Sequence, residues 1–136
     1  MLNVIVVDAQ GGGLGAAIVK SLSETYGERI HILALGTNVA ATSAMKKSGA
    51  ADCATGENAI CFNSKSADVI IGGVGIIAAS GMLGEITPKM AKAVAQSPAK
   101  KILVPISRCN IVVAGTEDKA LKELIDAAVS KISELL

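Results

Sequence analysis

Aromatic side chains are almost absent from this chain of 136 residues, which has one Tyr, one Phe and no Trp. Its hydrophobic residues still make up 51% of the total. The core must therefore be packed from Val, Ile, Leu, Ala and Met. A chain of this length fits a single domain, spanning residues 1–136, that is large enough to bury a real core.

Charged residues are also scarce, at 18% of the chain, and nearly balanced, with a net charge of +1. This composition gives no electrostatic case for binding nucleic acid or acidic lipid. The first apolar run breaks at Asp8, which makes it too short for a secretory leader or a membrane span. We expect neither nucleic acid nor a membrane as a partner.

Cysteine and histidine are too few and too scattered for a zinc site within one chain. Cys53, Cys61 and Cys109 form no CxxC pair, and the single histidine, His31, is far from each of them. We expect no metal site, although a thiol cluster assembled across subunits is an alternative. An odd number of unclustered cysteines and no recognisable signal peptide indicate a reducing cytoplasm, and Cys53 and Cys61 are expected to pack in the core.

Apolar, β-branched runs alternate with helical stripes along the chain. Strands are expected at Leu2–Val7, Ile30–Leu35, Ala51–Ala54, Asp68–Gly72, Lys101–Ile106 and Ile111–Ala114. Helices are expected from Leu14 to Tyr26, from Thr37 or Asn38 to Lys47, from Thr87 to Ser97, and from a Thr116 cap to Leu135. This alternation predicts an α/β fold, a single Rossmann-like domain with a mostly parallel, doubly wound sheet and the first strand at its centre.

Residues 57–62 allow two interpretations. Ile60-Cys61-Phe62 suits a strand, whereas Thr55 or Gly56 followed by Glu57 suits a helix start. A parallel crossover needs about a dozen residues, and the next strand begins sooner than that. We therefore expect a short helix.

A glycine-rich turn follows the first strand. Residues 11–16 read GGGLGA and fit G-x-G-x-x-[GA], between a strand and a helix as that motif requires. Glycine permits the tight turn and lets backbone N–H groups approach a phosphate at the helix N-terminus. We predict that Gly11, Gly12, Gly13 and Leu14 bind a nucleotide phosphate; the alternative is a tight turn without a ligand. A Walker A loop is excluded because Ala16 and Ala17 replace its Lys and Ser/Thr.

Two further segments are expected beside this turn. NAD sites usually carry an acid after the second strand, but Thr37 and Asn38 stand there, with no Arg for a 2′-phosphate. These two side chains would hydrogen-bond a ribose, or one of them only caps a helix. Gly73 and Gly75, after the fourth strand, are expected across the same crevice; alternatively they only allow close packing.

No complete catalytic set is recognisable, so the catalytic residues are unknown. Arg108 would favour the thiolate of Cys109, yet no histidine base lies nearby, and most free cysteines are small buried hydrophobes. Glu57 and Glu85 are the acids nearest to glycine-rich loops and are alternative bases. His31, at the opposite end of its strand, is expected to be structural.

The segments VDAQGGGLG, GTNVAATSAMKKSGA, IIGGVGI, GEITPKMA and KKILVPISRCN resemble a family of short bacterial proteins known only as a domain of unknown function. The resemblance covers nearly the whole chain and implies a Rossmann-like fold, but no activity. The opening motif is also similar to NAD(P)-binding dehydrogenase domains. The Tyr-x-x-x-Lys pair of short-chain dehydrogenases is missing, because the only tyrosine, Tyr26, has no Lys four residues later.

These observations favour a protein that binds a nucleotide or dinucleotide, with NAD or NADP as candidates. Two alternatives are a small NAD(P)-dependent oxidoreductase or transferase acting through Cys109 or Glu57, and a ligand-free oligomeric interaction subunit. The mean hydropathy of +0.52 is high for so small a chain. We therefore expect a homodimer, joined through the uncharged segment Ile76–Gly84 as an exposed apolar patch; the alternative is that this segment is a helix buried under the sheet.

Overall fold

Five strands pair into one parallel sheet in the computed structural model, which describes residues 1–106 and 110–136. Their order is β3-β2-β1-β4-β5. The bounds are Leu2–Asp8 for β1, Ile30–Gly36 for β2, Asp52–Thr55 for β3, Val69–Gly73 for β4 and Lys100–Val104 for β5. This order confirms the predicted Rossmann-like sheet with the first strand at its centre. The order reverses between β1 and β4, and the carboxyl ends of these strands form a crevice there.

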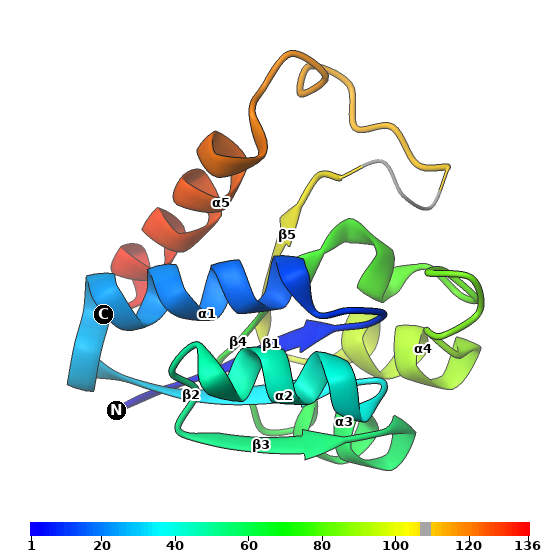
Figure 1. The fold of residues 1–136 in the computed structure, drawn as a ribbon, viewed down its shortest axis with the longest axis horizontal. Coiled ribbons are helices and arrows are strands. Elements are labelled where there is room, and N and C mark those ends of the chain that lie inside the picture. The colour runs from blue at the N-terminus through cyan, green and yellow to red at the C-terminus, as the bar shows by residue number, and fades with distance from the viewer. Residues whose placement is uncertain (107–109) are drawn as a thin grey trace.

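Helices cover both faces of the sheet (Figure 1). Helices α1 (Gly13–Tyr26) and α5 (Leu121–Ser130) pack on one face, and α3 (Glu57–Asn63) and α4 (Pro88–Gln96) on the other. Helix α2 (Val39–Lys47) packs beside α1. Three short 3₁₀ helices complete the described elements: η1 (Gly27–Arg29), η2 (Val74–Ile77) and η3 (Lys131–Leu135).

The central strand supplies both halves of the core. Val4 and Val6 of β1 belong to the cluster under α1 and α5, whereas Ile5 and Val7 belong to the cluster over α3 and α4. All four are at most 3% exposed. The uninterrupted apolar run thus follows from alternating side chains that meet helices on both faces.

Short polar side chains start two helices as expected. The Asn38 side chain accepts from the backbone N–H of Ala41 and caps α2, and the Thr87 hydroxyl accepts from Met90 and caps α4 ahead of Pro88. Residues 57–63 form helix α3, which confirms the choice of a helix over a strand there.

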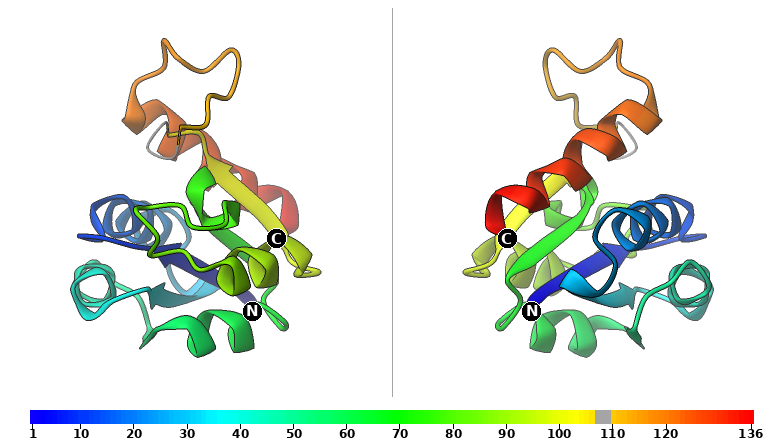
Figure 2. Two further views of the ribbon diagram at one scale, coloured as in Figure 1. Left: turned by 90° about the vertical axis from the view of Figure 1, so that its right-hand side faces the viewer. Right: turned by 90° about the vertical axis from the view of Figure 1, so that its left-hand side faces the viewer.

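The expected strand at 111–114 is wrong, and so is the expected start of the last helix. Residues 111–113 pair with no strand among the described residues, and Thr116 closes a turn by donating to the Val113 carbonyl. Helix α5 begins at Leu121 instead. β-Branched residues favour a strand only where a neighbouring surface receives them. Here the segment from 110 to 120 stands away from the sheet (Figure 2).

The expected apolar surface at Ile76–Gly84 is also wrong in large part. Ile76 and Met82 are 1% and 6% exposed, because they fold into the core beside α4. Only Ile77 and Leu83 among the larger side chains of this segment are exposed. In the described part of the chain, no helix has the length and apolarity needed to cross a membrane.

Candidate functional site

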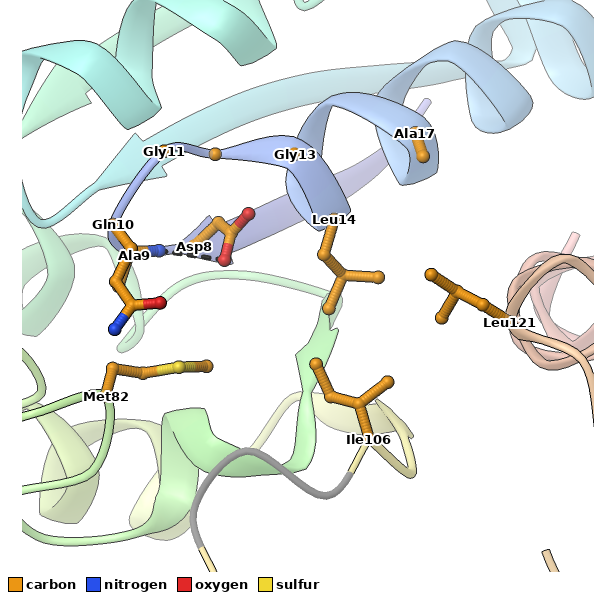
Figure 3. A pocket seen from close by; sticks show the side chains of 11 residues that line it. Asp8, Ala9, Gln10, Gly11, Gly13, Leu14, Ala17, Met82, Ile106 and Leu121 are labelled. Atoms are coloured by element: carbon orange, nitrogen blue, oxygen red, sulfur yellow. Dashed lines mark hydrogen bonds between the residues drawn. The ribbon is translucent and has the colours of Figure 1, made fainter. Parts of the chain in front are cut away.

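A cavity of about 310 Å³ opens at the carboxyl end of β1 (Figure 3). The glycine-rich turn, residues 8–14, forms one side of it. The other side is apolar and comes from Ala17, Met82, Ile106 and Leu121, which belong to four separate parts of the chain. The cavity thus lies where a ligand-binding crevice is expected in an open parallel sheet.

Glycine is required by the fold at only one of the three consecutive glycines. Gly12 has a φ of +75°, and a Cβ there would lie 2.7 Å from the Cα of Ala41. A Cβ at Gly11 or Gly13 would meet nothing within 4 Å. The bare backbone at these two positions faces open space in the cavity.

Three backbone donors of this turn have no partner in the part of the chain that the structure describes. Among the described residues nothing accepts from the N–H groups of Gly11, Gly13 and Leu14, whereas Gly12 donates to the Ala9 carbonyl. Gly13 and Leu14 begin the 14-residue helix α1, so the positive end of the helix dipole lies here. Free amides at a helix start are suited to an anion.

A buried carboxylate already occupies the inner side of the same turn. Asp8 is 5% exposed, and its two oxygens accept from the N–H groups of Ala9, at 2.8 Å, and Gly15, at 2.6 Å. Sequence analysis took Asp8 only as the end of the strand. The signal was an acid next to a glycine-rich motif. Such a carboxylate can accept from N–H groups in the first turn of the helix even though it is not the residue directly before that helix.

Of the predicted ligand residues, Gly11, Gly12, Gly13 and Leu14 line this cavity. Gly73 lies nearby, but a Cβ on it would approach the side chains of Leu14 and Ile106 at 3.0 and 3.2 Å. The surface expected to be bare is therefore covered by two apolar side chains. Gly75 lies in η2 and is not among the residues lining the cavity.

Thr37 and Asn38 converge on an acid from a distant segment. The Thr37 hydroxyl and the Asn38 amide donate to Oε1 of Glu85 at 2.7 and 2.9 Å. The backbone N–H of Gln10 donates to the same oxygen at 2.9 Å. These hydrogen bonds, that of Thr37 foremost, hold the pKa of Glu85 below its ordinary value of 4.5. A carboxylate therefore lies next to the end of β2, although the residues that follow this strand in the sequence include no acid.

The other candidate residues lie elsewhere. Glu57 accepts a hydrogen bond from Thr87 and joins α3 to the start of α4. His31 pairs with Asp52 at 2.8 Å. Cys53 is exposed on β3, an edge strand, so the expectation that it packs in the core is wrong, while Cys61 is half-buried.

The hypothesis of a reactive Cys109 beside Ser107 and Arg108 concerns residues outside those that the structure describes. Within the described ranges, no three His, Cys, Asp or Glu side chains gather as metal ligands would.

Comparison with protein families finds a match to a domain of unknown function (DUF3842) over residues 3–136. Among curated proteins none matches.

Two solved structures are similar to this chain in fold. A dodecameric FMN-dependent UbiX-like decarboxylase from Escherichia coli O157:H7 aligns with a TM-score of 0.52 and 16% identity, over 98% of this chain and 94% of that one. An arsenate reductase in the phosphate-binding state aligns with a TM-score of 0.42 and 16% identity, over 99% and 96% of the two chains. The likeness to the decarboxylase supports the fold alone.

Proposed function

This chain belongs to the DUF3842 family, whose description states no activity, and from its cavity we propose that it binds a phosphorylated ligand the size of a mononucleotide. The N–H groups of Gly11, Gly13 and Leu14, to which no described residue offers an acceptor, carry the proposal. They would hold the phosphate, and the helix dipole of α1 would add to the attraction.

The size of the cavity favours a mononucleotide over a dinucleotide. Ligand sites span roughly 300 to 1,000 Å³, and at about 310 Å³ this one lies at the lower limit. NAD and NADP, expected from the motif, would have to extend beyond it. FMN is a further candidate because the decarboxylase of similar fold depends on it.

The lining favours binding over catalysis. Leu14, Ala17, Ile106 and Leu121 offer an apolar surface to the body of the ligand. Asp8 is the only ionisable side chain among the described lining residues, and two backbone amides already occupy its oxygens. An oxidoreductase or transferase would need a further acid, base or nucleophile near the ligand.

The decisive experiment measures binding by calorimetry to wild type and to Gly13→Ala. Inorganic phosphate, AMP, FMN, NAD and NADP serve as probes. The added methyl points into open space, so it leaves the fold intact but blocks the approach of a phosphate. We expect wild type to bind at least one of these probes and Gly13→Ala to bind it at least about tenfold more weakly, which corresponds to about 1.4 kcal/mol.

The unliganded thermal midpoint serves as the control, and it should not fall in Gly13→Ala. Failure of wild type to bind any of the five probes would contradict the proposed function and favour the ligand-free interaction subunit. Equal binding by both proteins would move the ligand away from this turn.

A homo-oligomeric state is part of the same proposal. Exposed apolar side chains outside the cavity support it, among them Leu83 at 97% and Val112 at 69%. Because the mean hydropathy is +0.52, a second copy of the chain is the partner that we expect.

A further inference from the structure

Glu85 reaches the glycine-rich turn from the segment between η2 and α4. This segment folds back on itself: Ser80 N–H donates to the Ile86 carbonyl at 2.7 Å, and Ile86 N–H donates to the Gly81 carbonyl. The carboxylate is thereby delivered to a position 75 residues away in the chain, next to Gln10. A local sequence motif cannot show this arrangement.

The two oxygens of the carboxylate are used unequally. Oε1 accepts all three protein hydrogen bonds, from Gln10, Thr37 and Asn38. Oε2 accepts none from the described residues, and the side chain is only partly buried. The first oxygen therefore fixes the orientation of the group, and the second is left to accept hydrogen bonds from outside the protein.

Asn38 is itself fixed by its other contacts. Its amide nitrogen donates also to the Gln10 carbonyl, at 3.0 Å, and its side-chain oxygen accepts from Ala41 at the start of α2. The partners of Glu85 are thus held by the turn and by the helix cap. The carboxylate has a set position relative to the free amides.

The glycine-rich turn connects this carboxylate to the cavity. Gln10, which donates to Glu85, lines the cavity and is the residue directly before Gly11. Glu85 itself is not among the described residues that line the cavity, so a ligand with its 5′-phosphate on the turn would extend past Gln10 to reach the carboxylate. A carboxylate near the end of the second strand of a doubly wound sheet accepts from ribose hydroxyls.

We propose that Glu85 recognises the ligand by accepting hydrogen bonds from the 2′- and 3′-hydroxyls of its ribose. The fold thus brings a carboxylate to the end of β2, where the local sequence contains no acid. This inference rests on the proposed function and specifies its ligand: a 5′-ribonucleotide with both hydroxyls free. A 2′-phosphate would meet the negative carboxylate and be rejected, and a 2′-deoxyribose would lose a hydrogen bond.

The test compares three ligands that share a base and a 5′-phosphate: AMP, 2′-deoxy-AMP and adenosine 2′,5′-bisphosphate. Calorimetry with wild type should give AMP at least about tenfold tighter binding than either analogue, because a hydrogen bond to a charged group is lost or a like charge is added. Inorganic phosphate, which has no ribose, reports on the turn alone.

Glu85→Gln keeps an oxygen for the three internal donors and removes the charge. We expect its preference for AMP over 2′-deoxy-AMP to fall to about threefold or less, and its affinity for inorganic phosphate to stay within about twofold of wild type. Glu28→Gln makes the same chemical change in η1, between α1 and the start of β2 at the other end of the sheet. It should retain the wild-type preference.

Several results would overturn the inference. Equal binding of AMP and 2′-deoxy-AMP by wild type would do so, as would an unchanged preference in Glu85→Gln. Tighter binding of every probe by Glu85→Gln, inorganic phosphate included, would show that the carboxylate only holds the segment closed over the turn. If wild type binds inorganic phosphate or FMN but not AMP, the ribose inference fails and the phosphate site stands. If it binds none of these, both fail.

Discussion

The carboxylate of Asp8 holds the inner side of the glycine-rich turn in place. Its two oxygens accept from the N–H groups of Ala9 and Gly15, and the side chain is 5% exposed. A hydrogen bond to a charged group contributes about 1.5 to 3 kcal/mol to stability. The conformation of the turn between β1 and α1 therefore depends on this side chain.

Replacing Asp8 with Asn should therefore lower the stability of the fold. We expect Asp8→Asn to lose about 1 to 2 kcal/mol of unfolding free energy, because the N–H groups of Ala9 and Gly15 lose a charged acceptor. Urea unfolding measures this loss. An unchanged unfolding free energy would contradict the assigned role of Asp8.

Glu85 should contribute stability that depends on pH in a defined direction. Its pKa is lowered in the folded state by the hydrogen bonds from Thr37, Gln10 and Asn38, so the folded protein releases this proton more readily than the unfolded chain. The contribution is complete above the ordinary value of 4.5 and is lost as the pH falls through the lowered pKa. The difference in thermal midpoint between wild type and Glu85→Gln should be largest near pH 6 and shrink below pH 4.5. A difference that grows on acidification would contradict this assignment.

At the scale of elements, the turn between β1 and α1 combines one glycine that the fold requires, Gly12, with two that it does not, Gly11 and Gly13. Gly12→Ala should destabilise the fold by at least about 2 kcal/mol, since it forces an L side chain into positive φ against the backbone of α2. Gly13→Ala should leave the unfolding free energy unchanged or raise it by about 0.4 to 1 kcal/mol, because alanine reduces the conformational entropy of the unfolded chain. Thermal unfolding of both variants decides this, and equal losses would show that Gly13 is also structural.

Helix α5 is fastened to α1 by one buried hydroxyl. The Tyr26 side chain is 5% exposed and donates to the Val129 carbonyl at 2.6 Å. Tyr26→Phe should cost about 1 kcal/mol of unfolding free energy, because the carbonyl loses its donor while the ring still packs. Urea unfolding measures this loss; a neutral result would mean that water reaches the carbonyl.

Sequence analysis predicted the elements well where a pattern had a single structural solution. The run from Val4 to Val7 has no polar residue and can only be buried on both faces, and Pro88 after Thr87 can hardly be anything but a helix start. Prediction failed at 111–113, where β-branched residues have no sheet to join. Periodicity reports how a segment would pack, not whether a surface is there to receive it.

The site was predictable only as far as it is local in sequence. The glycines of the turn come from one motif, so their common position in the cavity was foreseeable. The position of Glu85 beside Gln10 depends on the tertiary fold, because the two residues are 75 positions apart in the sequence. Leu14 and Ile106 cover Gly73 through tertiary packing, which no pattern around Gly73 reveals.

At the scale of the whole molecule, part of the apolar excess of the chain lies outside the core, and one projecting segment carries two adjacent exposed apolar side chains. The 110–120 segment stands away from the sheet (Figure 2), and Val112 and Val113 in it are 69% and 40% exposed. Ile76 and Met82, by contrast, are buried. An interface between copies is therefore expected at the projecting segment rather than at Ile76–Gly84.

Light scattering should give wild type a particle mass above the 13.7 kDa of one chain at micromolar concentration. Val112→Glu should lower that mass, since a charge at an apolar interface is costly. Lys119→Glu, a charge change in the same segment outside the apolar run, is the matched control. A wild-type mass of 13.7 kDa would refute the oligomer, and an oligomer that survives Val112→Glu would place the interface around Leu83.

The central place of β1 has a consequence for how the protein is made. One neighbour of β1, β2, begins at Ile30, but the other, β4, pairs Val69 with Val4 and leaves the ribosome on the order of several seconds later. During that interval the central strand of the sheet can pair along one edge only, and its other edge is open to neighbouring nascent chains. The yield of folded protein should thus depend on the speed of translation between residues 37 and 73, a stretch that contributes little to the cavity itself.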